Sequence, residues 1–190
     1  MKRLTDFLLA LLCLLVFSPV LLVCALAVRI EDGHPVIYSQ ERIGRHGKPF
    51  HIYKFRSMRL DAEQDGPMML EVSGDSRLTK VGHFLRIHHL DELPQLWNVL
   101  KGDMAFVGPR PERAYFIQQI MEHDTRYEEL YALRPGVTSY ATLYNGYTDT
   151  MEKMLRRLEL DLHYLYHRSF WMDCKILAQT FFRVVSGKKF

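Results

Sequence analysis

The clearest feature of the hydrophobic pattern is an apolar run near the N-terminus. Residues 7–28 are apolar except for Ser18 and Pro19, which fall near the middle of the run. As one helix the run would be about 33 Å long, at about 1.5 Å per residue, which is enough to cross a bilayer. A secretory signal peptide is the alternative, because basic residues precede the run, but its apolar part is usually only about 7 to 15 residues long. The pattern therefore favours a membrane segment.

The Ser18-Pro19 pair bears on how this segment enters the membrane. Pro19 removes one intrahelical hydrogen bond and clashes with the carbonyl group of Leu15, so we expect a sharp bend, and the Ser18 hydroxyl can satisfy a freed backbone group. Basic residues flank both ends of the run, and positive charge prefers the cytoplasmic side, so both ends can be cytoplasmic. These residues alone leave two geometries open: a kinked helix that spans the membrane, and a re-entrant helix that enters and leaves on one side.

Two short segments rich in aromatic and branched residues, 35–40 and 50–57, predict a β-hairpin. Alternation along the second strand places Lys54 and Arg56 on the same face. That face is either solvated or part of a site for an anion. Every charge in residues 42–59 is positive, so phosphates, acidic lipid or nucleic acid would fit the sign of this stretch.

Three later segments, 93–100, 152–168 and 170–185, carry apolar residues at helical spacing. The last of them mixes aromatic and basic side chains. This mixture suits a helix that lies at a membrane surface, and it also suits a packed terminal helix.

Adjacent carboxylates stand where the first of these helices is expected to begin. Pro94 is typical of the first turn of a helix, which makes Asp91 the expected N-cap and places Glu92 at the first helical position. The free amides and the dipole at a helix start favour anions, so they stabilise an ionised Asp91 and also suit an incoming phosphate. Asp91 is therefore either a simple cap or part of a site that handles phosphate.

Two arginines next to prolines are further candidates. Arg110 lies between Pro109 and Pro111, which restricts the backbone on both sides and presents the guanidinium from a stiff loop. The planar fork of arginine suits phosphate oxygens. Arg134, which precedes a proline and a glycine, repeats this arrangement more weakly, because such a sequence also makes an ordinary turn.

Composition narrows the class of protein. The chain has 190 residues and a net charge of +3, an excess too small to indicate nucleic-acid binding by itself. Its three cysteines form no disulfide framework, which fits a reducing cytoplasm. We expect one membrane segment, residues 1–29, followed by one compact domain, residues 30–190.

Together these motifs resemble the bacterial sugar transferase family, which consists of small monotopic phosphoglycosyl transferases. The resemblance covers nearly the whole chain, and the motifs stand in the family's order. They are Ser18-Pro19 in the apolar run, Tyr53-Lys54-Phe55-Arg56-Ser57-Met58, Arg86 followed by Leu90-Asp91-Glu92-Leu93-Pro94-Gln95-Leu96, Asn98-Val99-Leu100-Lys101-Gly102-Asp103-Met104, Val107-Gly108-Pro109-Arg110-Pro111, Arg134-Pro135-Gly136-Val137-Thr138, and Asp161 with Tyr164.

The resemblance implies an α+β fold. In this fold a re-entrant membrane helix, broken at Ser18 and Pro19, precedes a small, mainly helical domain with a short β-hairpin and interfacial amphipathic helices. It also implies a monotopic protein at the cytoplasmic face of the bacterial inner membrane, in contact with membrane lipid and without a nucleic-acid partner. A homodimer is left open.

The resemblance further implies the reaction. Asp91 would attack the β-phosphate of a uridine diphosphate sugar (UDP-sugar), expel uridine monophosphate (UMP) and form a phosphosugar-aspartate, from which polyprenyl (undecaprenyl) phosphate takes the phosphosugar. Glu92 would act as acid or base or hold the geometry, and Mg²⁺ near Asp91 would neutralise the diphosphate. The residues expected around the nucleotide and phosphates are Lys54, Arg56, Arg86, Arg110, Arg134 and Asp161.

One position departs from the family pattern, because Tyr147 stands where many members have a further phosphate-binding arginine. Either Arg134 substitutes for it or the sugar pocket differs. Two other functions stay open. A membrane-anchored, Mg²⁺-dependent nucleotide-sugar phosphohydrolase would use Asp91 as nucleophile and water as acceptor. A non-enzymatic anchored module would bind acidic lipid or a partner through the basic stretch, and Asp91→Asn would leave it working.

Overall fold

The computed structural model describes residues 2–62, 75–146 and 148–186. Within these residues the fold is α+β and mostly helical, with two small sheets, which confirms the expected fold class. The chain forms two compact units, one made of Met1–Gln40 and His51–Lys101 and the other of Glu41–Phe50 and Gly102–Phe190. The division expected at residue 29 stays a prediction.

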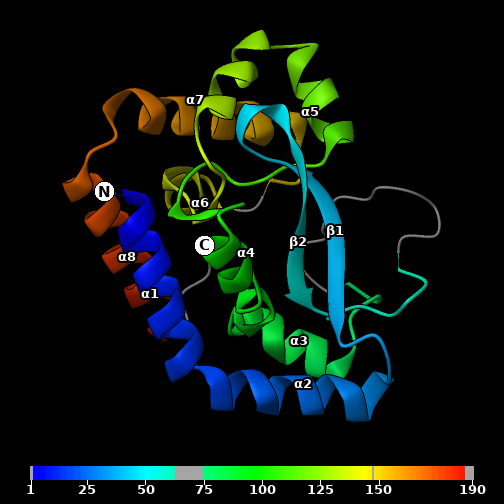
Figure 1. Ribbon diagram of the computed structural model, residues 1–190. Coiled ribbons are helices and arrows are strands. Elements are labelled where there is room, and N and C mark those ends of the chain that lie inside the picture. Colours follow the sequence, from blue (N-terminus) through cyan, green and yellow to red (C-terminus); the bar gives the residue numbers. More distant parts are fainter. Residues whose placement is uncertain (1, 63–74, 147, 187–190) are drawn as a thin grey trace. The chain divides into compact units, whose positions relative to one another are not determined.

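Each unit has its own set of elements (Figure 1). The first unit contains α1 (Lys2–Val16), α2 (Ser18–Asp32), α3 (Lys80–Ile87), the 3-10 helix η2 (Leu90–Glu92) and α4 (Gln95–Lys101). The second contains η1 (Arg45–Gly47), β3 (Ala105–Val107), α5 (Ala114–Met121), η3 (Thr125–Ala132), β4 (Gly136–Thr138), α6 (Tyr140–Asn145), α7 (Met151–His167) and α8 (Phe170–Val185). The hairpin strands β1 (Ile37–Ile43) and β2 (Pro49–Phe55) run through both, since the ends next to η1 belong to the second unit.

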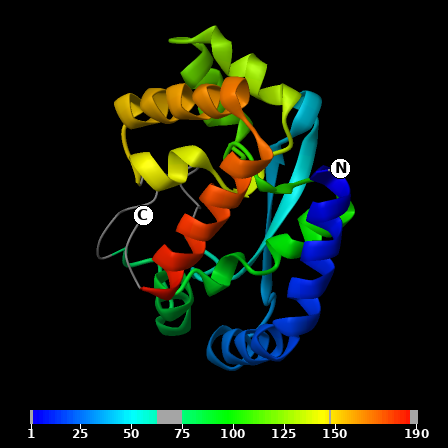
Figure 2. The same cartoon turned by 90° about the vertical axis from the view of Figure 1, so that its left-hand side faces the viewer.

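The apolar run forms the two helices α1 and α2, which Figures 1 and 2 show running in different directions. They are bent by 63° relative to each other, and Pro19 lies in the first turn of α2. The Ser18 hydroxyl donates to the Leu15 carbonyl oxygen at 2.8 Å, which is the group that Pro19 leaves without its helical donor. The predicted break and its side-chain compensation are therefore confirmed.

No single helix among the described residues is long and apolar enough to cross a membrane, whereas α1 and α2 taken together have sufficient length and apolar character. Many of their large apolar side chains are exposed, including Leu15, Leu22 and Val23.

Both ends of this helix pair are tied to the rest of the first unit. Near the start of α1, Arg3 donates to the carbonyl oxygens of Val99 and Leu100, the latter at 2.7 Å, at the end of α4. At the end of α2, the Glu31 carboxylate accepts the backbone amides of Lys80 and Val81, both at 2.8 Å, at the start of α3. These contacts satisfy backbone groups that the ends of α3 and α4 leave free.

The buried cluster of the first unit joins α2, β2 and α3. Its members are Cys24, Val28, Phe55 and Leu85. Gly82 lets α3 approach the chain after β2, since a Cβ atom there would lie 2.0 Å from the Ser57 carbonyl oxygen. A larger residue at this position would force the two backbones apart.

The second unit contains a parallel pair, β3 and β4, that sequence patterning did not predict. Ala105 pairs with Gly136, and Val107 pairs with Thr138. The backbones touch just beyond this pairing, because a Cβ atom on Gly136 would lie 2.2 Å from the Gly108 nitrogen. Both strands have three residues, which is too short for an alternating pattern to be recognised.

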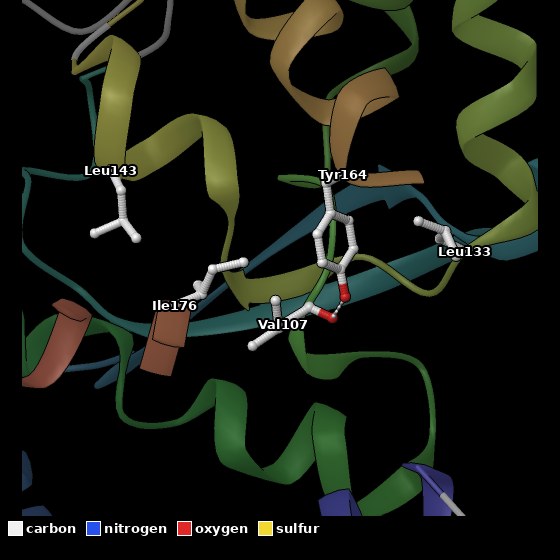
Figure 3. Close-up of a cluster of buried hydrophobic side chains, with 5 residues drawn as sticks. All are labelled: Val107, Leu133, Leu143, Tyr164 and Ile176. Carbon is white, nitrogen blue, oxygen red and sulfur yellow. Dashed lines mark hydrogen bonds between the residues drawn. The ribbon is translucent and has the colours of Figure 1, made fainter. Parts of the chain in front are cut away.

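Helix α8 packs against this small sheet, and Tyr164 of α7 joins the same apolar cluster, shown in Figure 3. The cluster consists of Val107, Leu133, Leu143, Tyr164 and Ile176. The helices predicted for residues 152–168 and 170–185 are confirmed as α7 and α8. Several aromatic side chains of α8 are exposed, with Trp171 at 79%.

Candidate active site

Asp91 and Glu92 lie in the short 3-10 helix η2, just before α4. The expectation that Asp91 caps the helix is wrong, because regular α-helix begins only at Gln95. Pro94 has no amide hydrogen to donate, and the surrounding residues make bonds of the shorter i to i+3 type, such as the amide of Leu93 to the carbonyl of Leu90 at 3.2 Å. Asp91 is thus held in a tight turn rather than at an open helix end.

The Asp91 side chain is enclosed, since the residue is only 5% exposed. Burial raises the pKa of Asp91 to about 6; Lys54 and Arg86 favour the charged form and the neighbouring Glu92 disfavours it. Desolvation is the dominant cause. A buried carboxyl group with a strongly shifted pKa beside fixed cations is typical of a catalytic residue, although structural ion pairs produce shifts as well.

Lys54 forms an ion pair with one of these two acids. Its ammonium nitrogen lies 2.6 Å from Glu92 Oε1, and both side chains are about one-fifth exposed. Asn98, which is completely buried, fixes the strand that carries Lys54: it accepts the Tyr53 amide at 3.1 Å and donates to the His51 carbonyl at 2.7 Å. The face of β2 that carries Lys54 is therefore turned towards the acids at this residue.

The two arginines expected near these acids lie in different settings. Arg86 is half-buried on α3, and its charge lowers the pKa of Asp91. Arg56 is only 4% exposed and pairs with the Asp32 carboxylate at 2.9 Å, and it also donates to the Asp32 carbonyl at 2.6 Å. The first unit thus brings Lys54 and Arg86 to the acids, whereas Arg56 pairs with Asp32 at the end of α2.

Arg110 projects from a loop of the second unit whose main chain is held on both sides. Before Arg110, the Pro109 carbonyl accepts the Gly136 amide at 2.9 Å. After it, the Pro111 carbonyl accepts the Arg42 side chain at 3.3 Å. These fixed bonds agree with the stiffness expected from the flanking prolines.

Next to this loop lies a buried ionic cluster that sequence analysis missed. Glu112 lies 2.7 Å from Arg157 of α7 and 3.5 Å from Arg42. Burial by itself would raise the pKa of Glu112, but Arg157, Arg42 and Arg110 outweigh it and hold the pKa below its ordinary value. The only signal in the sequence was a glutamate directly after the Pro-Arg-Pro motif.

Asp161 lies inside the second unit, on α7. It is 3% exposed, and burial raises its pKa to about 7, against the opposing effects of Arg157 and of the backbone amides of Ala141 and Arg110. Arg134 is half-buried and donates to the Gly102 carbonyl at 2.9 Å. Tyr147 lies outside the described residues. The roles of these residues stay predictions.

The donor set at Asp91 fits a magnesium ion that is shared with a substrate. Among residues 2–62, 75–146 and 148–186, no group of three or more His, Cys, Asp or Glu side chains could hold a metal alone. Mg²⁺ commonly binds through one or two carboxylates and completes its shell with substrate phosphates and water. Asp91 provides such a carboxylate, while Glu92 faces Lys54.

Comparison with known proteins gives a consistent result. The family model described as bacterial sugar transferase matches residues 1–187. A UDP-glucose:undecaprenyl-phosphate glucose-1-phosphate transferase of Escherichia coli (strain K12) is 44% identical over 185 residues, which cover 96% of this chain and 40% of the relative. A protein of the same name from Caulobacter vibrioides (strain ATCC 19089 / CIP 103742 / CB 15) is 41% identical over 186 residues, or 94% of this chain and 67% of the relative.

A third relative is named for a different sugar. The UDP-N-acetylgalactosamine-undecaprenyl-phosphate N-acetylgalactosaminephosphotransferase of Aeromonas hydrophila is 37% identical over 186 residues, which cover 98% of this chain and 44% of the relative. The chain thus spans about two-fifths of the length of the E. coli and A. hydrophila proteins.

Proposed function

Because the chain belongs to the bacterial sugar transferase family, we propose that it transfers a sugar phosphate from a UDP-sugar to polyprenyl phosphate, with undecaprenyl phosphate as the acceptor. The relatives named for this reaction match nearly the whole chain. Their names include both glucose and N-acetylgalactosamine, so the proposal concerns the class of reaction, and the sugar is left to experiment.

The observation that carries the proposal is the setting of Asp91. Its pKa of about 6 lies far enough below neutrality to leave the carboxylate mostly ionised at about pH 7. The same shift makes the carboxylate more basic than one in water, and the lost hydration makes it a better nucleophile. Lys54 and Arg86 supply positive charge beside it, which reduces the repulsion from an incoming phosphate.

The reaction proceeds in two displacements. In the first, an Asp91 oxygen attacks the β-phosphorus of the UDP-sugar, the bond from that phosphorus to the bridging oxygen breaks, and UMP leaves with the electron pair. In the second, a phosphate oxygen of polyprenyl phosphate attacks the same phosphorus, and Asp91 leaves as a carboxylate. The products are UMP and a polyprenyl diphosphate sugar, and the enzyme is regenerated.

Other residues of the chain position and balance these steps. Glu92, held by Lys54 at 2.6 Å, keeps a second negative charge out of the path of the attacking oxygen or moves a proton at the leaving phosphate. Arg110 and Arg134 are presented by fixed main chain and bind phosphate oxygens. Mg²⁺ held by Asp91 and the diphosphate would neutralise phosphate charge when bound.

The acceptor lipid requires a place at the membrane, and the bent pair α1–α2 supplies it. The 63° bend, the exposed apolar side chains and the basic residues near both ends suit a re-entrant anchor that enters one leaflet from the cytoplasmic face of the inner membrane. The contacts of Arg3 and Glu31 then fix the anchor to the unit that carries Asp91. A soluble donor and a membrane-bound acceptor can meet at such a site.

The test is UMP release by the purified chain with Mg²⁺ and a panel of UDP-sugars, with and without undecaprenyl phosphate. We expect one sugar to support sustained UMP release and lipid-linked product only when the lipid is present. Sustained release of UMP and free sugar phosphate without lipid would indicate the phosphohydrolase instead. No release with any sugar from folded protein would refute both.

Two variants with the same change of charge complete the experiment. Asp91→Asn should abolish release, while Glu122→Gln, at an exposed position on the second unit, should leave it unchanged. Thermal unfolding of both variants verifies that they fold.

A further inference from the structure

Two histidines, His163 and His167, lie four residues apart at the end of α7, and His167 is the last residue of the helix. Their rings are stacked, with centroids 4.3 Å apart and planes inclined by 26°. Residues at positions i and i+4 share one face of a helix, so both imidazoles project from the same side of α7. Both residues are exposed, so an ion from the solvent can reach the pair.

The tautomer of His167 is fixed by its partner in the pair. Its Nδ1 lies 2.9 Å from the His163 carbonyl oxygen, which can only accept a hydrogen bond. In neutral His167 the proton is therefore on Nδ1, and Nε2 keeps its lone pair. Metal-binding histidines commonly have this arrangement, in which the second ring nitrogen donates to a backbone carbonyl or a carboxylate. Within the described parts of the chain, no hydrogen bond or ion pair reaches the His163 ring or Nε2 of His167.

The His163 ring is also held from its other side, by Tyr140 at the start of α6. The centroids of these two rings are 5.3 Å apart, and the Tyr140 ring in turn lies 4.6 Å from that of Tyr144. Rings that are already ordered lose less conformational entropy when they bind a ligand. The end of α7 adds a favourable field, because the free carbonyl groups of the last helical turn attract a cation.

We propose that His163 and His167 form a binding site for a divalent metal ion that prefers imidazole, namely Ni²⁺, Cu²⁺ or Zn²⁺, with water completing the coordination shell. Two nitrogens that bind one ion at about 2.1 Å each lie no more than about 4.2 Å apart, so rings whose centroids are 4.3 Å apart need little movement to share it. Mg²⁺ prefers oxygen ligands, so this site differs in chemistry from the magnesium site expected at Asp91.

The first test is calorimetric titration of the detergent-solubilised full chain, without a polyhistidine tag, with Ni²⁺ in an excess of Mg²⁺. The wild type should bind one equivalent of Ni²⁺ that His163→Gln and His167→Gln each bind about tenfold or more weakly, because a single imidazole loses the advantage of chelation. His123→Gln is the matched control. His123 is exposed and its Nδ1 lies 3.0 Å from the Gln119 carbonyl oxygen, so it shares the tautomer of His167 but has no histidine four residues away.

This control should bind Ni²⁺ as the wild type does. Equal affinity in the wild type and in the two variants of the pair would overturn the proposal, as would a wild type that binds no Ni²⁺. Ni²⁺ that binds only the folded chain should also raise the Tm of the wild type and of His123→Gln more than that of the other two variants. None of these measurements requires the transferase reaction, so they stand apart from the proposed function.

The second test moves the pair along the helix. In the His167→Gln background, Glu159→His places an exposed histidine four residues before His163 and should restore the affinity for Ni²⁺. Arg168→His in the same background places a histidine five residues after His163, away from the shared face, and should not restore it. Equal affinity in the two double variants would contradict a site that depends on i, i+4 spacing.

Discussion

Replacing Asp161 with asparagine is expected to alter how protein stability depends on pH. Burial raises the pKa of Asp161 from an ordinary value of 3.8 to about 7. Between pH 3.8 and about pH 7 the folded protein keeps a proton on Asp161 that the unfolded chain releases. The stability that this proton contributes is therefore complete below pH 3.8, and it is lost as the pH rises through about 7. Asparagine does not titrate and carries no such dependence.

The size of the effect follows from the two pKa values. Between about pH 5 and about pH 8, the wild type should lose about 2 to 3 kcal/mol of stability relative to Asp161→Asn. The charged groups around Asp161 include Arg157, which favours its ionised form, and Glu112, which opposes it. Both are present in the two proteins, so their own titration largely cancels in the comparison. The cost of burying the asparagine amide is the same at every pH, so it does not affect how the stability difference between the two proteins changes with pH.

The assay is thermal unfolding of both detergent-solubilised proteins, followed by tryptophan fluorescence across this pH range. The difference in Tm between variant and wild type should move in favour of the variant by about 5 to 10 °C as pH rises. Glu122→Gln, which changes an exposed acid, should show no such trend. A Tm difference that stays constant with pH, or one that moves towards the wild type, would refute the assignment of a raised pKa to Asp161.

Two further substitutions test the surroundings of the acids. Lys54→Met removes the cation 2.6 Å from Glu92 and should lower the rate of UMP release by about tenfold or more. Lys54→Arg keeps the positive charge and should retain most of the rate. Equal activity in the two variants would contradict a role for the charge. Asn98→Leu removes the hydrogen bonds to the backbone of Tyr53 and His51 and should lower the free energy of unfolding by about 2 to 4 kcal/mol. Thermal unfolding measures this loss, and an unchanged Tm would contradict the prediction.

Features set by neighbouring residues were predictable from the sequence. The bend at Ser18 and Pro19 follows from one missing amide hydrogen and one hydroxyl, and both effects act within a single helical turn. Helices α7 and α8 are long enough for their apolar spacing to identify them. The hairpin was recognised as well, with ends displaced by a few residues because short strands have weak boundaries.

Features that depend on distant residues were not predictable in the same way. The pairing of Glu112 with Arg157 and the burial of Asp161 require α7 to pack against the Pro-Arg-Pro loop, and nothing local in either segment encodes that contact. The strands β3 and β4 are too short to show a period. The wrong prediction of a helix cap at Asp91 has a local cause, because Pro94 suits the first turn of a helix but lies in the turn before α4.

The covalent step at Asp91 is tested most directly by mass spectrometry of the intact and digested protein after incubation with the accepted UDP-sugar and Mg²⁺, without polyprenyl phosphate. We expect the mass to increase by one sugar phosphate, carried by the peptide that contains Asp91, with UMP released in equal amount. Addition of undecaprenyl phosphate should remove the adduct. A protein that makes lipid-linked product while Asp91 is never modified, or an Asp91→Asn variant that still forms the adduct, would contradict this mechanism.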